Sequence, residues 1–298
     1  MIMENRRVNL FLVGAMRAGT TSLRRLLTNH PDIYFSPIKE PHYFAEELPI
    51  TFYEPSRFFN IDSYFINDFP NYLHTAKVDT DEHYRKLFSL AKKEQYFAEA
   101  STGYLHAPNC AENIHAYNPD ATIVIILRDP IKRAYSHFNM NTALGRETRS
   151  FETIIKRELE AYNGNELSWD SYLQMSSYDS AIDRYKRLFN NVVVLKLENL
   201  TSNFDEEFDR LNALLNIEPL HEVKFSHRNI TRKLRFQRVF HTLRKWGVKD
   251  YFSTLFNSKF KRWLFKALSI QISKEIPLSK EVKDELAVIF RKESSGYY

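Results

Sequence analysis

Cysteine is almost absent from this chain of 298 residues, which contains only Cys110. An internal disulfide is therefore impossible, and a zinc site built on cysteine ligands is disfavoured. No apolar run approaches the roughly 20 residues that a membrane-spanning helix needs, and Met1–Arg7 lacks the pattern of a signal peptide. We therefore expect a reducing compartment and predict that the protein is cytoplasmic.

Glycine is also scarce, with 7 residues, whereas aromatic residues make up 14% of the chain. Hydrophobic residues account for 43% and charged residues for 27%, which is typical of a globular protein and excludes a disordered tail or a fibre. The length allows one large domain or two small ones. Because no repeat or low-complexity linker interrupts the chain, we expect a single domain over residues 1–298.

The net charge of +5 is unevenly distributed. Residues 224–266 hold 13 Lys or Arg and one acid, whereas residues 41–76 hold five acids and one base and so carry a net charge of −4. A nucleic-acid-binding surface needs aromatic platforms on a basic face. Here the aromatic residues cluster in the acidic segment, so we predict no nucleic-acid partner.

Short apolar runs alternate with helical patterns along the chain. Runs typical of buried parallel strands occur at Val8–Val13, Tyr96–Ala98, Thr122–Leu127 and Asn191–Leu197. Helices are predicted at Thr20–Asn29, Asp81–Ala91, Pro130–Asn141 and Asn203–Leu215. This alternation predicts an α/β fold with a parallel sheet flanked by helices on both faces.

The C-terminal part is predicted to be helical and to belong to the same domain. Apolar residues fall at helical spacing in Phe236–Leu243 and again in Phe256–Ala267, with Lys and Arg on the opposite face of each. We favour amphipathic helices that cover the sheet. Contact of these basic helices with a membrane surface is the less favoured alternative.

A glycine-containing turn follows the first strand and reads GAMRAGTTS over residues 14–22. It resembles a Walker P-loop, but Thr20 follows Gly19 where that loop has lysine. The cation of this turn is Arg17, which precedes Gly19. Backbone N–H groups in such a turn, together with the positive end of the following helix, bind phosphate. No aspartate ends the strand at 122–127, so the turn favours a terminal 5′-phosphate over a triphosphate with magnesium. The candidate phosphate-binding residues are Arg17, Ala18, Gly19, Thr20, Thr21 and Ser22.

A second candidate site reads RDPIKRAYS over residues 128–136. Asp129 is a good helix N-cap and Pro130 a good first helical residue. Arg128 is thereby placed at the carboxyl end of a parallel strand, where ligands of open α/β sheets bind. Ser136 follows about two turns along the helix. Arg128 and Ser136 are therefore candidates for holding a second phosphate.

Taken in order, four segments resemble the PAPS-dependent sulfotransferase family, and its bacterial and carbohydrate branch more than its cytosolic aryl branch. They are FLVGAMRAGTTSLRRLL, HPDIYFSPIKEPHYF, EASTGYL and IVIILRDPIKRAYSHF. PAPS, 3′-phosphoadenosine 5′-phosphosulfate, is the family's sulfate donor, and PAP is the product left after transfer. The resemblance implies that the first turn binds the 5′-phosphosulfate and that the RDP…S element binds the 3′-phosphate.

A further match, NITRKLR at residues 229–235, is similar to the family's late basic loop, which closes over the donor. It makes Lys233 and Arg235 candidates for donor binding. A solvated basic stretch is the equal alternative.

The resemblance to the carbohydrate branch gives Glu40 the role of general base. Arg17 would offset the charge that grows on the leaving phosphate, and Lys39 would assist. Pro41 biases Glu40 toward an extended backbone. His42 is the alternative base, because its reference pKa suits neutral pH. No metal is expected, since arginine, backbone amides and other basic side chains supply the positive charge.

The acceptor side is expected between Tyr43 and Tyr72, a segment with ten aromatic residues and mostly acidic charge. These features favour a small neutral or cationic acceptor with a hydroxyl or amine group. The alternative is that the rings simply form core under a long loop. Glu99 and His106 are further acceptor-side candidates, each with a structural role as its alternative.

The sequence thus predicts an enzyme that transfers a sulfuryl group from PAPS to a small molecule. A nucleoside or small-molecule kinase is the rival enzyme, and it would need magnesium and a lysine after Gly19. The third hypothesis is a non-enzymatic module that binds a nucleotide or docks on a membrane.

Overall fold

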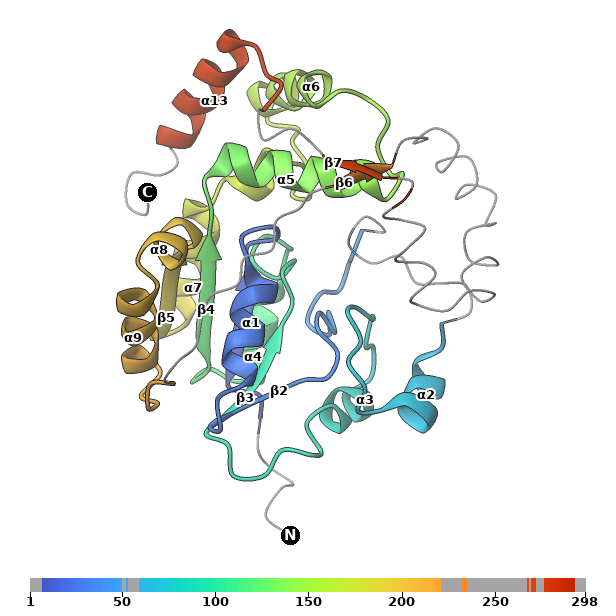
Figure 1. Cartoon of the computed structure of the whole chain (residues 1–298), viewed down its shortest axis with the longest axis vertical. Coiled ribbons are helices and arrows are strands. Elements are labelled where there is room, and N and C mark those ends of the chain that lie inside the picture. The colour runs from blue at the N-terminus through green and yellow to red at the C-terminus, as the bar shows by residue number, and fades with distance from the viewer. Residues whose placement is uncertain are drawn as a thin grey trace.

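A five-stranded parallel sheet forms the centre of the molecule, as seen in the computed structural model (Figure 1). The structure describes residues 7–49, 52, 59–220, 267 and 276–292, and the backbone of residues 232–234 and 269–271. The strand order is β2-β3-β1-β4-β5. The strands are β1 (Leu10–Gly14), β2 (Ile33–Phe35), β3 (Tyr96–Ala100), β4 (Thr122–Leu127) and β5 (Asn191–Lys196).

The burial of each strand follows from its place in the sheet. Every residue of β1 and β4 is buried, because both strands have neighbours on each side and helices over each face. In β5, which lies at an edge, buried residues alternate with more exposed ones. The continuous apolar runs therefore belong to the centre of the sheet.

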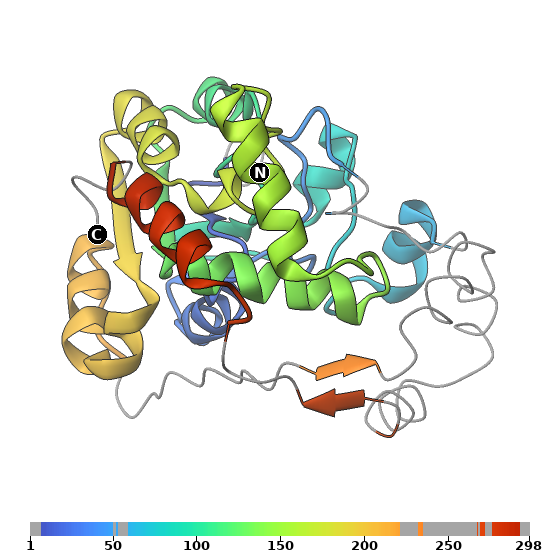
Figure 2. The ribbon, with the colours of Figure 1, turned by 90° about the horizontal axis from the view of Figure 1, so that it is seen from above.

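Helices cover both faces of the sheet, as predicted. Figures 1 and 2 show α1 and α9 on one face, and α4 and α7 on the other. Helix α5 instead crosses above the carboxyl ends of the strands (Figure 1). The helices on the sheet and above it are α1 (Thr20–Thr28), α4 (Cys110–Tyr117), α5 (Pro130–Ala143), α6 (Phe151–Asn163), α7 (Asp179–Leu188), α8 (Leu197–Ser202) and α9 (Phe204–Leu214).

Smaller elements follow β2 along the chain. They are α2 (Ile61–Ser63), the π-helical turn η1 (Tyr64–Asp68), α3 (Asp81–Lys86) and, later, the short turn η2 (Gln174–Ser176). Helix α3 ends five residues before the predicted Ala91, because the chain tightens after it: the Leu87 N–H is shared between the carbonyl oxygens of His83 and Tyr84.

The C-terminal part is only partly helical in the described residues. Helix α13 (Lys280–Lys292) packs its apolar side against α5 and α6, where Leu286, Phe138 and Phe151 share one hydrophobic core. The predicted stripe Phe236–Leu243 lies outside the described residues, as does Phe256–Ala267 apart from Ala267. None of the helices in the described part of the chain is long and apolar enough to cross a membrane.

Three residues of the late basic segment form one strand of a two-stranded antiparallel sheet. Arg232–Leu234 forms β6 and pairs with Ser269–Gln271, which forms β7. The backbone of these residues finds its hydrogen-bond partners in a second segment, and so it is extended rather than looped. The single-domain organisation stays a prediction.

Candidate functional site

The phosphate turn lies between β1 and α1, at the carboxyl edge of the sheet. It is tied to the neighbouring strand because the Ala15 N–H donates to the Ile126 carbonyl oxygen (2.7 Å). Gly19, at φ 99°, occupies the left-handed region that glycine tolerates best. Gly19 is also the N-cap of α1 and offers no side-chain acceptor, so the first N–H groups of the helix have no capping side chain.

Two arginines and a serine converge on this turn. The Arg17 guanidinium donates to Ser136 Oγ (3.1 Å), and Arg128 donates to the Arg17 carbonyl oxygen (3.1 Å). Burial and the nearby Arg128 charge lower the pKa of Arg17. An anion placed here would offset this repulsion, so the residues fit a phosphate-bearing ligand.

The start of α5 forms as predicted and positions two of these side chains. The Asp129 carboxylate accepts the Lys132 N–H (2.8 Å), and Pro130 is the first helical residue. Arg128 therefore directly follows the last residue of β4, and Ser136 lies further along α5, above the sheet. The structure adds a direct contact between the two candidate sites, through the hydrogen bond of Arg17 to Ser136.

The segment after β2 carries Glu40 to the same edge of the sheet. The Glu40 N–H donates to the Ala100 carbonyl oxygen (2.7 Å), and the Glu40 carbonyl oxygen accepts the Ala76 N–H (3.3 Å). The expectation that Pro41 holds Glu40 extended is wrong, since the φ of Glu40 is 64°. The two backbone hydrogen bonds, on opposite sides of the residue, hold this uncommon conformation.

Three side chains surround the Glu40 carboxylate. Lys39 donates a hydrogen bond to Oε1, Thr102 donates to Oε2 (2.9 Å), and the His42 Nε2 atom lies 3.7 Å from Oε2. Burial acts to raise the pKa of Glu40, but the charge and hydrogen bond of Lys39 together with the charges of His42 and His74 outweigh it, and the pKa falls to about 2. Glu40 is therefore ionised at neutral pH.

Accessibility separates the three predicted catalytic residues of this segment. The Glu40 side chain is 12% exposed, whereas those of Lys39 and His42 are 1% and 0% exposed. Burial lowers the pKa of His42 to about 4, so His42 is neutral at pH 7. Of the three side chains, only that of Glu40 keeps a measurable exposed fraction.

The phosphate turn and the carboxylate segment belong to one electrostatic site, because the Glu40 charge acts to raise the pKa of Arg17. A family model described as "Sulfotransferase family" matches residues 9–222, which span both segments. The chain belongs to the sulfotransferase family. The donor and product implied by the sequence, PAPS and PAP, are those of this family.

Relatives of this chain include a carbohydrate sulfotransferase and a heparan sulfate sulfotransferase. Carbohydrate sulfotransferase 15 of Homo sapiens is 23% identical over 256 residues, covering 72% of this chain and 44% of the relative. Heparan sulfate glucosamine 3-O-sulfotransferase 3B1 of Mus musculus is 22% identical over 223 residues, covering 74% and 49%. This sulfotransferase therefore spans about half the length of the curated relatives it matches.

The solved structure of a sulfotransferase from Alicyclobacillus acidocaldarius is similar over almost its whole length. The TM-score is 0.58 at 28% sequence identity, and the match covers 83% of this chain and 93% of that chain. The α/β fold and the family predicted from the sequence are thus confirmed.

The late basic segment of this sulfotransferase packs against the helix that contributes to the second phosphate site. The backbone of β6, which includes Lys233, contacts α5, the helix that carries Ser136 (Figure 1). Arg235, the other residue predicted here, lies outside the described residues. Donor binding by Lys233 and Arg235 stays a prediction.

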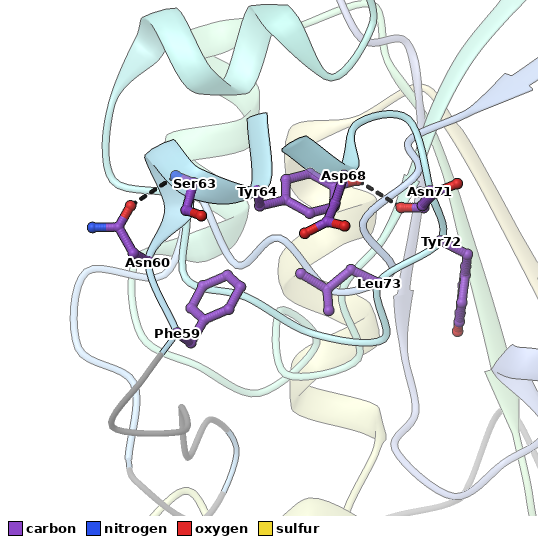
Figure 3. A pocket seen from close by; sticks show the side chains of 8 residues that line it. All are labelled: Phe59, Asn60, Ser63, Tyr64, Asp68, Asn71, Tyr72 and Leu73. Atoms are coloured by element: carbon purple, nitrogen blue, oxygen red, sulfur yellow. Dashed lines mark hydrogen bonds between the residues drawn. The ribbon is translucent and has the colours of Figure 1, made fainter. Parts of the chain in front are cut away.

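The aromatic residues expected on the acceptor side divide into two groups. Phe44, Tyr64 and Phe65 are buried in the hydrophobic core, as the core alternative predicts. Phe59 is half-buried, and Tyr72 is 55% exposed. Both line a surface pocket, to which the buried Tyr64 also contributes (Figure 3). Tyr53 and Phe58 lie outside the described residues.

Glu99 and His106 are both buried, which favours their structural alternative. Glu99 lies in β3 and is 1% exposed. The His106 Nε2 atom lies 3.1 Å from the Ser177 carbonyl oxygen. Thr102, the hydroxyl donor to Glu40, belongs to the same EASTGYL segment and was not predicted. Its signal was its place just after a strand, beside the segment that carries Glu40.

Proposed function

We propose that this sulfotransferase moves the sulfuryl group of PAPS to a hydroxyl or amine of a small acceptor that is neutral or cationic. One observation carries the proposal. A cationic phosphate turn with Arg17 and a slightly exposed carboxylate, Glu40, meet at the carboxyl edge of one parallel sheet.

The donor would lie along the carboxyl edge of the sheet. The turn at residues 15–22 and the start of α1 would hold the 5′-phosphosulfate, and Arg128 with Ser136 would hold the 3′-phosphate. Lys233 and Arg235 would close over the donor. The convergence of Arg17, Arg128 and Ser136 supports this placement. The two arginine charges repel each other, and a bound anion would relieve that repulsion.

In the proposed transfer, one bond forms, one bond breaks and one proton is transferred. The acceptor oxygen or nitrogen forms a bond to sulfur, while the bond between sulfur and the phosphate oxygen breaks and leaves its electron pair on that oxygen. Arg17 offsets the charge that grows on the phosphate. Glu40 accepts the proton that the acceptor loses. Charge is thereby balanced by side chains and backbone amides, and the proposal includes no metal.

Accessibility supports Glu40 rather than His42 as the base. A base must come within hydrogen-bond reach of the proton it removes, and the His42 ring is fully buried behind the Glu40 carboxylate. A carboxylate with a pKa of about 2 is a weak base. It suits a reaction in which the proton leaves late, once the forming bond to sulfur has made the acceptor acidic.

Binding of PAP, the product that PAPS leaves after transfer, distinguishes this proposal from the kinase hypothesis. Isothermal titration calorimetry in the presence of EDTA should show that PAP binds, and ATP with magnesium should bind far more weakly or not at all. Binding of ATP only with magnesium, and no binding of PAP, would instead support a kinase. The missing lysine after Gly19 already favours the first outcome.

The cytoplasmic setting also remains part of the proposal. It rests on the single cysteine, Cys110, which is buried and free. Fractionation of cells that produce the protein, followed by immunoblotting, tests it.

A further inference from the structure

A pocket of about 290 Å³ lies beside the segment that carries Glu40 (Figure 3). Its lining combines aromatic, aliphatic, amide and carboxylate side chains: Phe59, Asn60, Ser63, Tyr64, Asp68, Asn71, Tyr72 and Leu73. This volume is at the small end of the range for ligand pockets. It fits one end of a small molecule rather than a chain of sugars.

The chain itself connects this pocket to Glu40. Leu73 forms a parallel β-bridge with Ile38, and its carbonyl oxygen accepts the Lys39 N–H (2.8 Å). Three residues further on, the Ala76 N–H donates to the Glu40 carbonyl oxygen (3.3 Å). Residues 73–76 therefore run beside residues 38–40, with the pocket at one end and Glu40 at the other.

A single carboxylate gives the pocket its charge. In Figure 3 the Asp68 carboxylate points toward the Phe59 ring and the Leu73 side chain, with the Tyr64 ring behind it. No described residue forms an ion pair with this carboxylate or donates a hydrogen bond to it. The polar neighbours are engaged elsewhere, since Asn60 caps α2 at Ser63 and the Tyr64 hydroxyl donates to the Asn71 carbonyl oxygen (2.7 Å).

The sequence segment that supplies the pocket is acidic overall. Residues 41–76 carry five acids and one base. One cation, Arg24, lies over the Tyr72 ring (5.1 Å) and donates to the Ser36 carbonyl oxygen. Arg24 thus occupies one face of Tyr72 and leaves Asp68, Phe59 and Tyr64 for a ligand.

We infer that this pocket binds a positively charged ammonium group of the acceptor, with Asp68 as its counter-ion and the Phe59 and Tyr64 rings as its aromatic walls. The inference deepens the proposed function and rests on it, because it assigns the acceptor to the class of alcohols or amines that carry a separate cationic group. The ammonium end lies in the pocket, and the reacting group lies toward Glu40.

An isosteric pair of probes tests the inference without requiring turnover. Choline and 3,3-dimethylbutan-1-ol have the same shape and the same hydroxyl, and only choline is charged. Binding of each is measured by saturation-transfer NMR, with and without PAP. We expect choline to bind about three to ten times more tightly, as an exposed carboxylate and two aromatic walls allow.

Two variants locate the effect. Asp68→Asn should abolish the preference for choline, whereas Asp62→Asn should keep it, because Asp62 belongs to the same acidic segment but pairs with His83 (3.1 Å) and does not line the pocket. Equal binding of the two probes by the unmodified protein, or an unchanged preference in Asp68→Asn, would overturn the inference. So would tighter binding of methyl β-glucoside than of choline, since it would assign the pocket to a neutral sugar.

The two proposals fail in different ways. If PAP does not bind but the preference for choline depends on Asp68, the pocket stands as a cation site and the sulfuryl-transfer function does not. If PAP binds and the preference is absent, the function stands and the acceptor class is wrong.

Discussion

At the residue scale, Glu40 is the proposed base, and its neighbours Lys39, Thr102 and His42 position its carboxylate. The carboxylate is held from behind by Lys39 and from the side by Thr102, and the ring of His42 lies 3.7 Å away. The Glu40 side chain keeps 12% of its surface exposed. The sequence placed Glu40, Lys39 and His42 together as catalytic candidates, and the structure brings them together but gives them unequal access.

Replacement of Glu40 by glutamine keeps the shape of the side chain and removes its basicity. We expect kcat to fall by roughly 10²–10⁴-fold, the usual range for a lost acid–base group, with PAP affinity nearly unchanged. The matched control is His42→Asn, which should cost much less because His42 is buried. Steady-state kinetics and PAP calorimetry on both variants check this. Full activity of Glu40→Gln beside an inactive His42→Asn would reverse the assignment.

The buried carboxyl group of Glu99 makes the stability of the folded protein depend on pH. Burial raises the pKa of Glu99 to about 7, although the neighbouring Tyr84 and Tyr104 hydroxyls oppose the shift. The folded protein therefore favours the protonated carboxyl, and the stability linked to it is lost as pH rises from about 4.5 through 7. A shift of this size corresponds to roughly 3 kcal/mol.

The comparison with Glu99→Gln isolates this effect from the buried histidines, which titrate in the opposite direction. Urea unfolding at pH 5 and pH 8 should show that the free energy of unfolding of the unmodified protein, relative to Glu99→Gln, is lower at pH 8. The same difference between the two proteins at both pH values would show that Glu99 titrates normally in the folded state.

At the scale of elements, the best predicted junction is that between β4 and α5. An apolar run, an N-cap aspartate and a proline together fix where the strand ends and the helix begins, so Arg128 and Ser136 could be placed from the sequence. Helices α4, α6 and α7 were not predicted. Helix α6 nevertheless has a helical signal in the sequence, because Ser150 caps it and Phe151, Ile154, Ile155 and Leu159 fall at helical spacing.

The β4–α5 junction makes a selective prediction about the donor. Arg128→Ala should weaken binding of PAP much more than binding of adenosine 5′-phosphosulfate, which lacks the 3′-phosphate. The loss of a charge-assisted hydrogen bond is worth about 1.5–3 kcal/mol. Calorimetry with both ligands measures it. Equal weakening of the two would mean that Arg128 does not bind the 3′-phosphate.

At the scale of the whole molecule, the order of motifs predicted both the fold class and the family, and both are confirmed. The pocket beside Glu40 could not be predicted. It depends on the parallel bridge between Ile38 and Leu73 and on the turn that aims Asp68 at Phe59, and neither leaves a periodic signal. For the same reason the sequence could not separate the aromatic residues of the core from those of the pocket.

The measurement that tests the central claim most directly is transfer of radiolabelled sulfate from PAPS to a pool of small metabolites. The unmodified protein should form a labelled product, with one PAP released per sulfate transferred. Addition of EDTA should leave the rate unchanged, and Glu40→Gln should reduce it by roughly 10²-fold or more. Failure to label any acceptor, in a preparation that binds PAP and is fully folded, would contradict transfer to a small molecule, and equal labelling by Glu40→Gln would contradict the proposed site.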